Sequence, residues 1–449
     1  MMAVDVTYTQ DGRLVFGEVV CDCGIEHAQP QVDVYLDAGI LKNVPAYIAR
    51  RGFGKKCVLV ADNITYPLAG QRCQEVLERA GYEVRPCVIT RKDHVEPDEC
   101  ACGEVLLSIQ HDTDFLISVG SGSLTDITRI NAQRCSLPFV CVGTAPSMDG
   151  YTSAIAPLLL RGAKIHRNGK CPEIIVCDLD ILKDAPMDMV VAGFGDVLGK
   201  YIAIADWRIG NIINDEIFCQ ACGDMVSGAL QKLLDNIEGI KARTEQGIRA
   251  LMEGLLLAGL TVMIIGHTRA VASVEHNISH HWEMAKLARG ETPPSHGAAV
   301  GVATLMVWPA FMRFAREGFV EKPDVQALLA GRLSPAQRTD WLQQAYGEEA
   351  ARAIIAENPG DFLTDEEHAR RIGCAVSRYA DIRDVINDMP DLSVVRTAMQ
   401  TLGAPTTPAE VGIDEELAAL SMRAGKDYRT RYTLFKLLDE CGLLESYLA

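Results

Sequence analysis

Four of the chain's ten histidines fall within a stretch of 21 residues, from His276 to His296. A helix over this stretch places His276 and His280 one turn apart on the same face. His296 follows beside a glycine. Single histidines on helices are usually structural, whereas two imidazoles on one face with a third nearby are typical of a divalent metal site. The histidine pattern therefore predicts a metal centre.

A carboxylate would complete such a ligand set, and Asp196 is the candidate. It stands in the glycine-rich run from Gly193 to Gly199, where small neighbours let it approach other backbone closely. One aspartate and two histidines leave an open coordination position, as a Lewis-acid site requires. A helix N-cap is the alternative role for this aspartate. The ligand types suit zinc, nickel or ferrous iron, so they leave the metal open.

The second chemical motif is a glycine-rich segment, from Gly120 to Leu124, between a predicted strand and a helix-compatible stretch. Glycines let the backbone approach a pyrophosphate, and the free N–H groups at a helix start face the anion. Thr125 occupies the position of the third glycine in the full dinucleotide fingerprint. A tight turn between sheet and helix is therefore the alternative reading.

Asp62 strengthens the dinucleotide hypothesis because it ends an upstream predicted strand. A carboxylate at that place can accept hydrogen bonds from both hydroxyls of an adenosine ribose. Its charge would repel a 2′-phosphate, which favours NAD and makes NADP the alternative. A turn aspartate is the structural alternative.

The elements that must position these residues change in character along the chain. Residues 1–185 alternate short β-rich runs with helical spacing, which predicts a parallel βαβ sheet. Asn168-Gly169, between two β-compatible stretches at 158–165 and 173–176, predicts a type I′ hairpin. The predicted strands are residues 57–61, 83–90, 114–119 and 138–142, and the first clear helix is 71–81.

From Met187 onward the apolar residues recur at three- and four-residue spacings, as in helices. We expect an α/β, Rossmann-like dinucleotide-binding domain over 1–185 and an all-α metal-binding domain over 186–449. Pro186 is the local breaker between them. A polar segment at about 316–371 is predicted to be a solvated insertion in the second domain.

The chain has 449 residues with 43 Lys+Arg against 60 Asp+Glu, a net charge of −17. This balance argues against nucleic-acid partners and against docking on an anionic membrane. Hydrophobic residues make up 48%, which excludes a disordered chain. The longest apolar stretch, Gly254 to Gly266, is too short to span a bilayer, and the N-terminal residues lack a signal-peptide pattern. We therefore expect a cytoplasmic protein without membrane insertion.

Fifteen cysteines are scattered over the chain. Without a signal peptide, reduced thiols are the expected state. A structural zinc site needs four ligands, and no two close pairs have the usual spacing. The pairs are therefore expected to be structural or incidental. They are Cys21 and Cys23, Cys100 and Cys102, and Cys219 and Cys222.

Several blocks occur together in one order: Gly120–Ser123, Gly143–Ser153, Gly193–Asp196, Glu275–His280, His296–Gly297, and then Gly403–Thr406 leading to Gly412–Asp414. In this order the chain resembles the iron-alcohol-dehydrogenase and dehydroquinate-synthase superfamily. Within it, the block Gly195–Tyr201 followed by Asp206-Trp207 is similar to the bacterial sn-glycerol-1-phosphate dehydrogenases. The resemblance covers 55–315 well and 395–440 less closely. The chain departs from the family at Ser121 and over 268–274, which bears on fine specificity.

The resemblance implies roles for individual residues. Asp196, His276 and His296 would ligate the metal, and Asp149 and His280 would contact the substrate and take part in catalysis. Asp196 and Lys200 would also face the substrate. The residues implied to hold the dinucleotide are Asp62, Gly120, Ser121, Gly122, Ser123, Leu124, Thr144, Ala145, Pro146, Ser147 and Ser153.

The implied reaction is the reversible reduction of dihydroxyacetone phosphate by NADH to sn-glycerol 1-phosphate, a step of phospholipid metabolism. The metal, nickel or zinc with iron as the alternative, would polarise the carbonyl, and His280 would relay a proton. Lys200 is one candidate for the substrate phosphate. A basic cluster around the predicted hairpin is the other, unless it is simply solvated: Arg161, Lys164, His166, Arg167 and Lys170.

Three alternatives stay open from the sequence. A glycerol or polyol dehydrogenase would share fold, metal and cofactor, and a dehydroquinate-synthase-like cyclase would share the scaffold. That second family carries Glu at the position of Asp196, which counts against it. A non-catalytic metal- or nucleotide-binding protein is the third. In each case the apolar helical domain leads us to expect a homodimer or a larger homo-oligomer.

Overall fold

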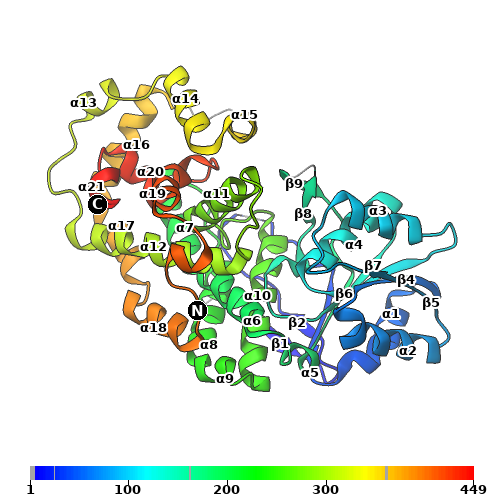
Figure 1. The fold of residues 1–449 in the computed structure, drawn as a ribbon. Coiled ribbons are helices and arrows are strands. Elements are labelled where there is room, and N and C mark those ends of the chain that lie inside the picture. The colour runs from blue at the N-terminus through cyan, green and yellow to red at the C-terminus, as the bar shows by residue number, and fades with distance from the viewer. Residues whose placement is uncertain (1–5, 25, 161–162, 359–362, 449) are drawn as a thin grey trace. The chain divides into compact units, whose positions relative to one another are not determined.

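The computed structural model describes residues 6–24, 26–160, 163–358 and 363–448 (Figure 1). The chain forms two compact units. Unit 1 comprises Met1–Val20, Glu26–Val197 and Asp224–Gly266, and unit 2 comprises Cys21–Ile25, Leu198–Gly223 and His267–Ala449. The last strand ends at Asp178, and every described element after it is a helix. The predicted fold class is thus confirmed, while the boundary near residue 185 stays a prediction.

Unit 1 is built on a six-stranded parallel sheet with the order β3-β10-β7-β6-β4-β5. Its central strands are buried on both faces, so they read as continuous aliphatic runs such as Val58 to Val60. The predicted strands are all present. The bounds are β3 Asp33–Asp37, β4 Lys56–Asp62, β5 Glu83–Ile89, β6 Phe115–Gly120, β7 Phe139–Gly143 and β10 Ile174–Asp178.

Helices cover both faces of this sheet. α1 (Val44–Arg51) and α2 (Gln71–Arg79) pack together on one side, and α3 (Glu99–Ser108) and α4 (Gly122–Cys135) on the other (Figure 1). The core under α1 and α2 holds Tyr47, Leu77, Phe115 and Val176, all nearly inaccessible to solvent. The helix predicted over 71–81 is confirmed as α2.

The β-hairpin exists, but its predicted turn is wrong. β8 (Ile155–Leu160) pairs antiparallel with β9 (Ala163–Asn168), and Ile155 lies opposite Asn168, so Asn168-Gly169 does not connect the two strands. Asn168 ends β9, and Gly169 does not have the positive φ that a type I′ turn needs. The glycine at 169 serves packing instead, because a Cβ there would lie 2.5 Å from Arg129 Cγ.

Apart from short 3-10 and π-helical segments, the remaining elements of unit 1 are a small ribbon and five α-helices. β1 (Val6–Tyr8) and β2 (Leu14–Phe16) pair antiparallel. The helix α6 starts directly after Pro186, the predicted breaker, and its last residue, Leu198, belongs to unit 2. The α-helices are α5 Leu179–Leu182, α6 Met187–Leu198, α8 Gln220–Asp235, α9 Ile237–Lys241 and α10 Glu245–Ile265. The first four residues of α8 belong to unit 2.

Unit 2 contains only helices among its described residues. α11 packs against α12, α7 and α19, and Trp207, Trp282 and Trp308 are fully buried in this core. The bounds are α7 Lys200–Asn214, α11 Val274–Ala288, α12 His296–Glu317, α13 Val325–Ala330, α14 Pro335–Tyr346, α15 Glu348–Glu357, α16 Asp365–Ser377, α17 Tyr379–Asn387, α18 Leu392–Leu402, α19 Glu415–Ala424, α20 Leu434–Glu440 and α21 Leu444–Leu448.

The polar segment at 316–371 forms α13, α14, α15 and part of α16. It is not solvated throughout. Leu342, Ala351 and Ile354 are buried in one cluster with Tyr428. Trp341 Nε1 donates to Asp427 Oδ2 at 2.9 Å, which anchors the segment to the C-terminal part of unit 2.

Two helices in the described residues, α10 and α12, are long and apolar enough to cross a membrane by length and composition. The apolar stretch noted in the sequence is the second half of α10. The most apolar windows of α10 and α12 are 78% and 72% buried inside the protein. This burial is the pattern of core helices.

Candidate active site

One edge of the sheet in unit 1 gathers the residues predicted to bind a dinucleotide. Asp62, Gly120 and Gly143 end the neighbouring strands β4, β6 and β7. Because these strands are parallel, their carboxyl ends meet at one edge, where open α/β sheets bind ligands. The N–H of Thr144 donates to the carbonyl of Gly120 at 3.1 Å, which joins the two loops that leave β6 and β7.

The glycine-rich segment leads directly into α4, which begins at Gly122. The first N–H groups of a helix have no partner within the helix, so Gly122, Ser123 and Leu124 offer donors to an anion. A Cβ on Gly120 would lie 2.4 Å from Leu124 Cδ1, so a glycine is needed for this close turn. Thr125, in place of a third glycine, donates its hydroxyl to the Ser121 carbonyl at 2.7 Å.

Asp62 does act as a turn residue. Its Oδ1 accepts the backbone N–H groups of Ile64 at 2.9 Å and Thr65 at 2.6 Å, which fixes the bend after β4. The structural alternative is thus confirmed for one carboxylate oxygen. A ribose would use the other oxygen, so the two roles are compatible.

The loop after β7 is tied to its surroundings in unit 1. Tyr151 donates its hydroxyl to the Ala145 carbonyl at 2.7 Å, and Ser147 Oγ lies 2.5 Å from Ser121 Oγ. A Cβ on Gly193 would lie 1.9 Å from the Pro146 oxygen, so α6 approaches this loop through glycine. Ser153 instead bonds the backbone N–H of Ile155, at the start of β8.

Asp196 is fully buried in the last turn of α6. The N-cap alternative is therefore wrong, since an N-cap stands at the start of a helix. Its Oδ2 accepts the backbone N–H of Asp149 at 2.9 Å. Unit 1 thus brings together the two aspartates that the sequence assigned to metal and substrate.

The histidines of unit 2 gather as the spacing predicted. α11 carries His276 and His280, and His296 is the first residue of α12. The ring centroid of His296 lies 5.4 Å from that of His276 and 5.4 Å from that of His280. Ligand atoms of His280, Glu283 and His296 lie within 4.8 Å of one another. Glu283 has no predicted role, although it stands one helical turn after His280.

A buried chain of hydrogen bonds orients His276. Its Nδ1 lies 2.7 Å from Glu275 Oε1, which also accepts the Ser273 N–H at 2.9 Å. Glu275 is fully buried. With Nδ1 protonated toward this carboxylate, Nε2 keeps a lone pair for a metal, the usual support of a metal-binding histidine.

Two further contacts complete this support. The Ser273 hydroxyl donates to Asp206 Oδ2 at 2.6 Å, and burial raises the pKa of Asp206 to about 7. A Cβ on Gly199 would lie 3.4 Å from His276 Cε1 and 3.3 Å from the Glu275 side chain. The glycine therefore lets α7 begin against the imidazole.

His281 shows the contrasting structural case. It points into the core, where its Nε2 donates to the Ala345 carbonyl at 2.7 Å. Burial lowers its pKa to about 4, so the ring is neutral. His280, one residue earlier, is half-buried and has Glu283 Oε2 at 3.5 Å from its Nδ1.

The comparisons identify the family. A 38% identical relative covers 94% of this chain and 95% of its own length, and it is a glycerol-1-phosphate dehydrogenase [NAD(P)+] from Halalkalibacterium halodurans. The chain belongs to the glycerol-1-phosphate dehydrogenase family. A second relative of the same name, from Bacillus licheniformis, is 31% identical over 95% of this chain and 94% of its own. The resemblance inferred from the motifs is confirmed.

Two further comparisons concern the N-terminal part of the chain and its fold. The iron-containing alcohol dehydrogenase family matches residues 35–186. Maleylacetate reductase from a Rhizobium species has a similar fold, with a TM-score of 0.59 at 12% identity over 94% of this chain and 97% of its own. That likeness concerns the fold alone.

The basic residues that the sequence offered as ligands for the substrate phosphate differ in burial and in their partners. Lys200 is fully buried at the first position of α7. Lys164 lies close enough to Asp126 to oppose the rise in its pKa that burial causes. Lys170 pairs with Glu173 at 3.3 Å, and Arg161 lies outside the described residues.

Proposed function

We propose that this protein catalyses the reversible, metal-dependent reduction of dihydroxyacetone phosphate to sn-glycerol 1-phosphate with NADH. The observation that carries this is the 38% identity, over 94% of the chain, to a glycerol-1-phosphate dehydrogenase [NAD(P)+]. In the balanced reaction, the ketone gains a hydride and a proton, and NADH becomes NAD⁺.

The proposed metal ligands are Asp196, His276 and His296. The Glu275 carboxylate on Nδ1 of His276 supports this set, because it leaves Nε2 for coordination. Gly199 lies against the His276 ring. Asp196 precedes Gly199 by only three residues in the sequence, which supports its place in the same ligand set. Nickel or zinc suits these ligands, with iron as the alternative.

When bound, the metal supplies Lewis acidity and the dinucleotide supplies the hydride. His280 is the proposed proton donor: it holds a proton at Nε2 while Nδ1 faces Glu283, and it passes that proton to the substrate oxygen. Asp149 is the proposed partner of a substrate hydroxyl, beside Asp196. Lys200 is the proposed partner of the substrate phosphate.

The dinucleotide is proposed to bind at the sheet edge of unit 1. Asp62 would take the ribose through Oδ2, which favours NAD over NADP. The remaining proposed contacts are the segments Gly120–Leu124 and Thr144–Ser147, and Ser153. We further propose a cytoplasmic homodimer.

The deciding experiment compares NADH oxidation with dihydroxyacetone phosphate and with dihydroxyacetone. Chelated protein receives nickel, zinc or iron in separate reactions, so the same assay identifies the metal. We expect a strong preference for the phosphorylated ketone in at least one reconstituted sample. Equal rates with both ketones would refute the proposed substrate and favour a polyol dehydrogenase.

A further inference from the structure

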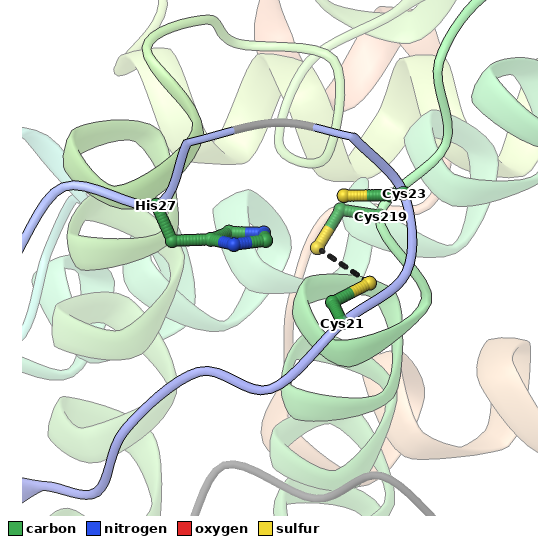
Figure 2. Close-up of side chains that lie close together, drawn as sticks. All are labelled: Cys21, Cys23, His27 and Cys219. Carbon is green, nitrogen blue, oxygen red and sulfur yellow. Dashed lines mark hydrogen bonds between the residues drawn. The ribbon is translucent and has the colours of Figure 1, made fainter.

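Three cysteine thiols meet in unit 2, one of them far from the other two in sequence. Cys21 and Cys23 come from an N-terminal segment, and Cys219 immediately precedes α8. Their sulfur atoms lie within 4.8 Å of one another, and Cys21 Sγ is 3.7 Å from Cys219 Sγ. Figure 2 shows the three thiols and His27.

The sulfur spacing suits a tetrahedral metal. Zinc–sulfur bonds of about 2.3 Å place two sulfur ligands of a tetrahedron about 3.8 Å apart. A disulfide would need a sulfur–sulfur separation of about 2.05 Å. The observed 3.7 Å fits the edge of such a tetrahedron and is too long for a covalent bond.

Local backbone geometry favours shared ligation. The backbone bends at residues 22–24, and Cys21 and Cys23 stand on this one bent segment. Gly24 follows with φ of +79°, a conformation that side chains rarely adopt, so the chain turns directly after the pair. The Cys222 N–H donates to Cys219 Sγ at 3.4 Å, a contact that stabilises a bound thiolate.

We propose that Cys21, Cys23 and Cys219 of unit 2 bind a zinc ion. Their three thiolates supply three of the four positions of a tetrahedron, and thiolates are the usual ligands of structural zinc. The ion would fasten this segment to the start of α8, across 198 positions of sequence.

The sequence predicted a structural or incidental role for these cysteines and no zinc site, and the proposal replaces that prediction for Cys21, Cys23 and Cys219. Thiolates select zinc over magnesium, calcium and manganese. The site is chemically distinct from the proposed catalytic set, which contains no sulfur. Its ligands join two segments that are distant in sequence, so its expected effect is on stability.

The test replaces the metal with cobalt in the full-length protein and follows thiolate-to-cobalt charge-transfer absorption. We expect this absorption in the wild type and in His296→Ala, and its loss in Cys219→Ser and Cys23→Ser. Plasma mass spectrometry should show about one equivalent less metal per chain in the two serine variants. The matched control is Cys100→Ser, in a pair with the same one-residue spacing as Cys21 and Cys23.

A second measurement uses the wild type alone, in case a serine variant fails to fold. A thiol-specific mercurial should release about one equivalent of zinc into a colorimetric chelator. Absent thiolate absorption, or no zinc release by the mercurial, would overturn the proposal. So would thiols that need a reductant before alkylation, since that result indicates a disulfide. Loss of activity in His296→Ala tests the proposed function separately.

Discussion

In unit 1 the residues proposed to hold the dinucleotide stand at or after strand ends, and Gly122, Ser123 and Leu124 among them offer backbone N–H groups at the start of α4. In unit 2 the proposed metal ligands are histidine side chains at a helix face, supported by the buried carboxylate of Glu275. The sheet edge therefore depends on backbone shape, which glycine permits. The histidine face depends on the orientation and protonation of side chains. Substitutions in unit 1 should therefore alter nucleotide binding, and substitutions in unit 2 should alter metal binding.

The largest effect is expected from removing a histidine of unit 2. His276→Ala or His296→Ala should lower kcat/KM by about 10³-fold or more, because the Lewis acid is worth several kcal/mol. Bound metal, measured by plasma mass spectrometry, should fall by about one equivalent per chain. A fully active, metal-replete His296→Ala protein would contradict the assignment.

The next effect tests whether Glu275 acts through His276. Glu275→Gln should weaken metal affinity about 10- to 100-fold, as is usual when the partner of a metal-binding histidine is lost. The measurement is metal affinity by competition with a chelator. Activity should return at saturating metal, which a merely unfolded protein would not show. The control is Glu291→Gln, an exposed residue paired with Lys286.

A substitution in unit 1 should change the affinity for the nucleotide and leave the metal content unchanged. Gly120→Ala places a Cβ 2.4 Å from Leu124 and should raise KM for NADH about tenfold, equal to about 1.4 kcal/mol. Metal content should stay unchanged. The control is Gly103→Ala, where a Cβ meets nothing within 4 Å. A change in metal content with an unaltered KM would reverse the division between the units.

The smallest effect concerns the pH dependence of stability. Burial raises the pKa of Asp206 to about 7, so the folded state holds its proton more tightly than the unfolded state. Its stabilising contribution is complete below pH about 4 and is lost as pH rises through about 7. In Asp206→Asn, the Tm should therefore fall by a few degrees less than in the wild type between pH about 4 and about 7, as measured by thermal unfolding. As a control, replacing the exposed Asp340 by Asn should give the same dependence of Tm on pH as the wild type.

Local patterns predicted much of both units. Aliphatic runs predicted the strands of the parallel sheet, and three- and four-residue spacings predicted the helices that follow. The position predicted for the hairpin turn was wrong because Asn168-Gly169 matches a turn signal for another reason. Gly169 is a glycine because a Cβ there would collide with the Arg129 side chain. A residue type chosen for packing cannot be told from one chosen for a turn without the neighbouring element.

By itself, the sequence determined the α/β and then all-α order, the grouped histidines of α11 and α12, and the family. These depend on residues near one another or on motifs in a set order. Only the tertiary structure showed that Glu275 orients His276 and that Cys21 and Cys23 meet Cys219, 198 positions from Cys21. Contacts across such a separation depend on how the elements pack, and the spacing of residues along a chain does not encode that packing.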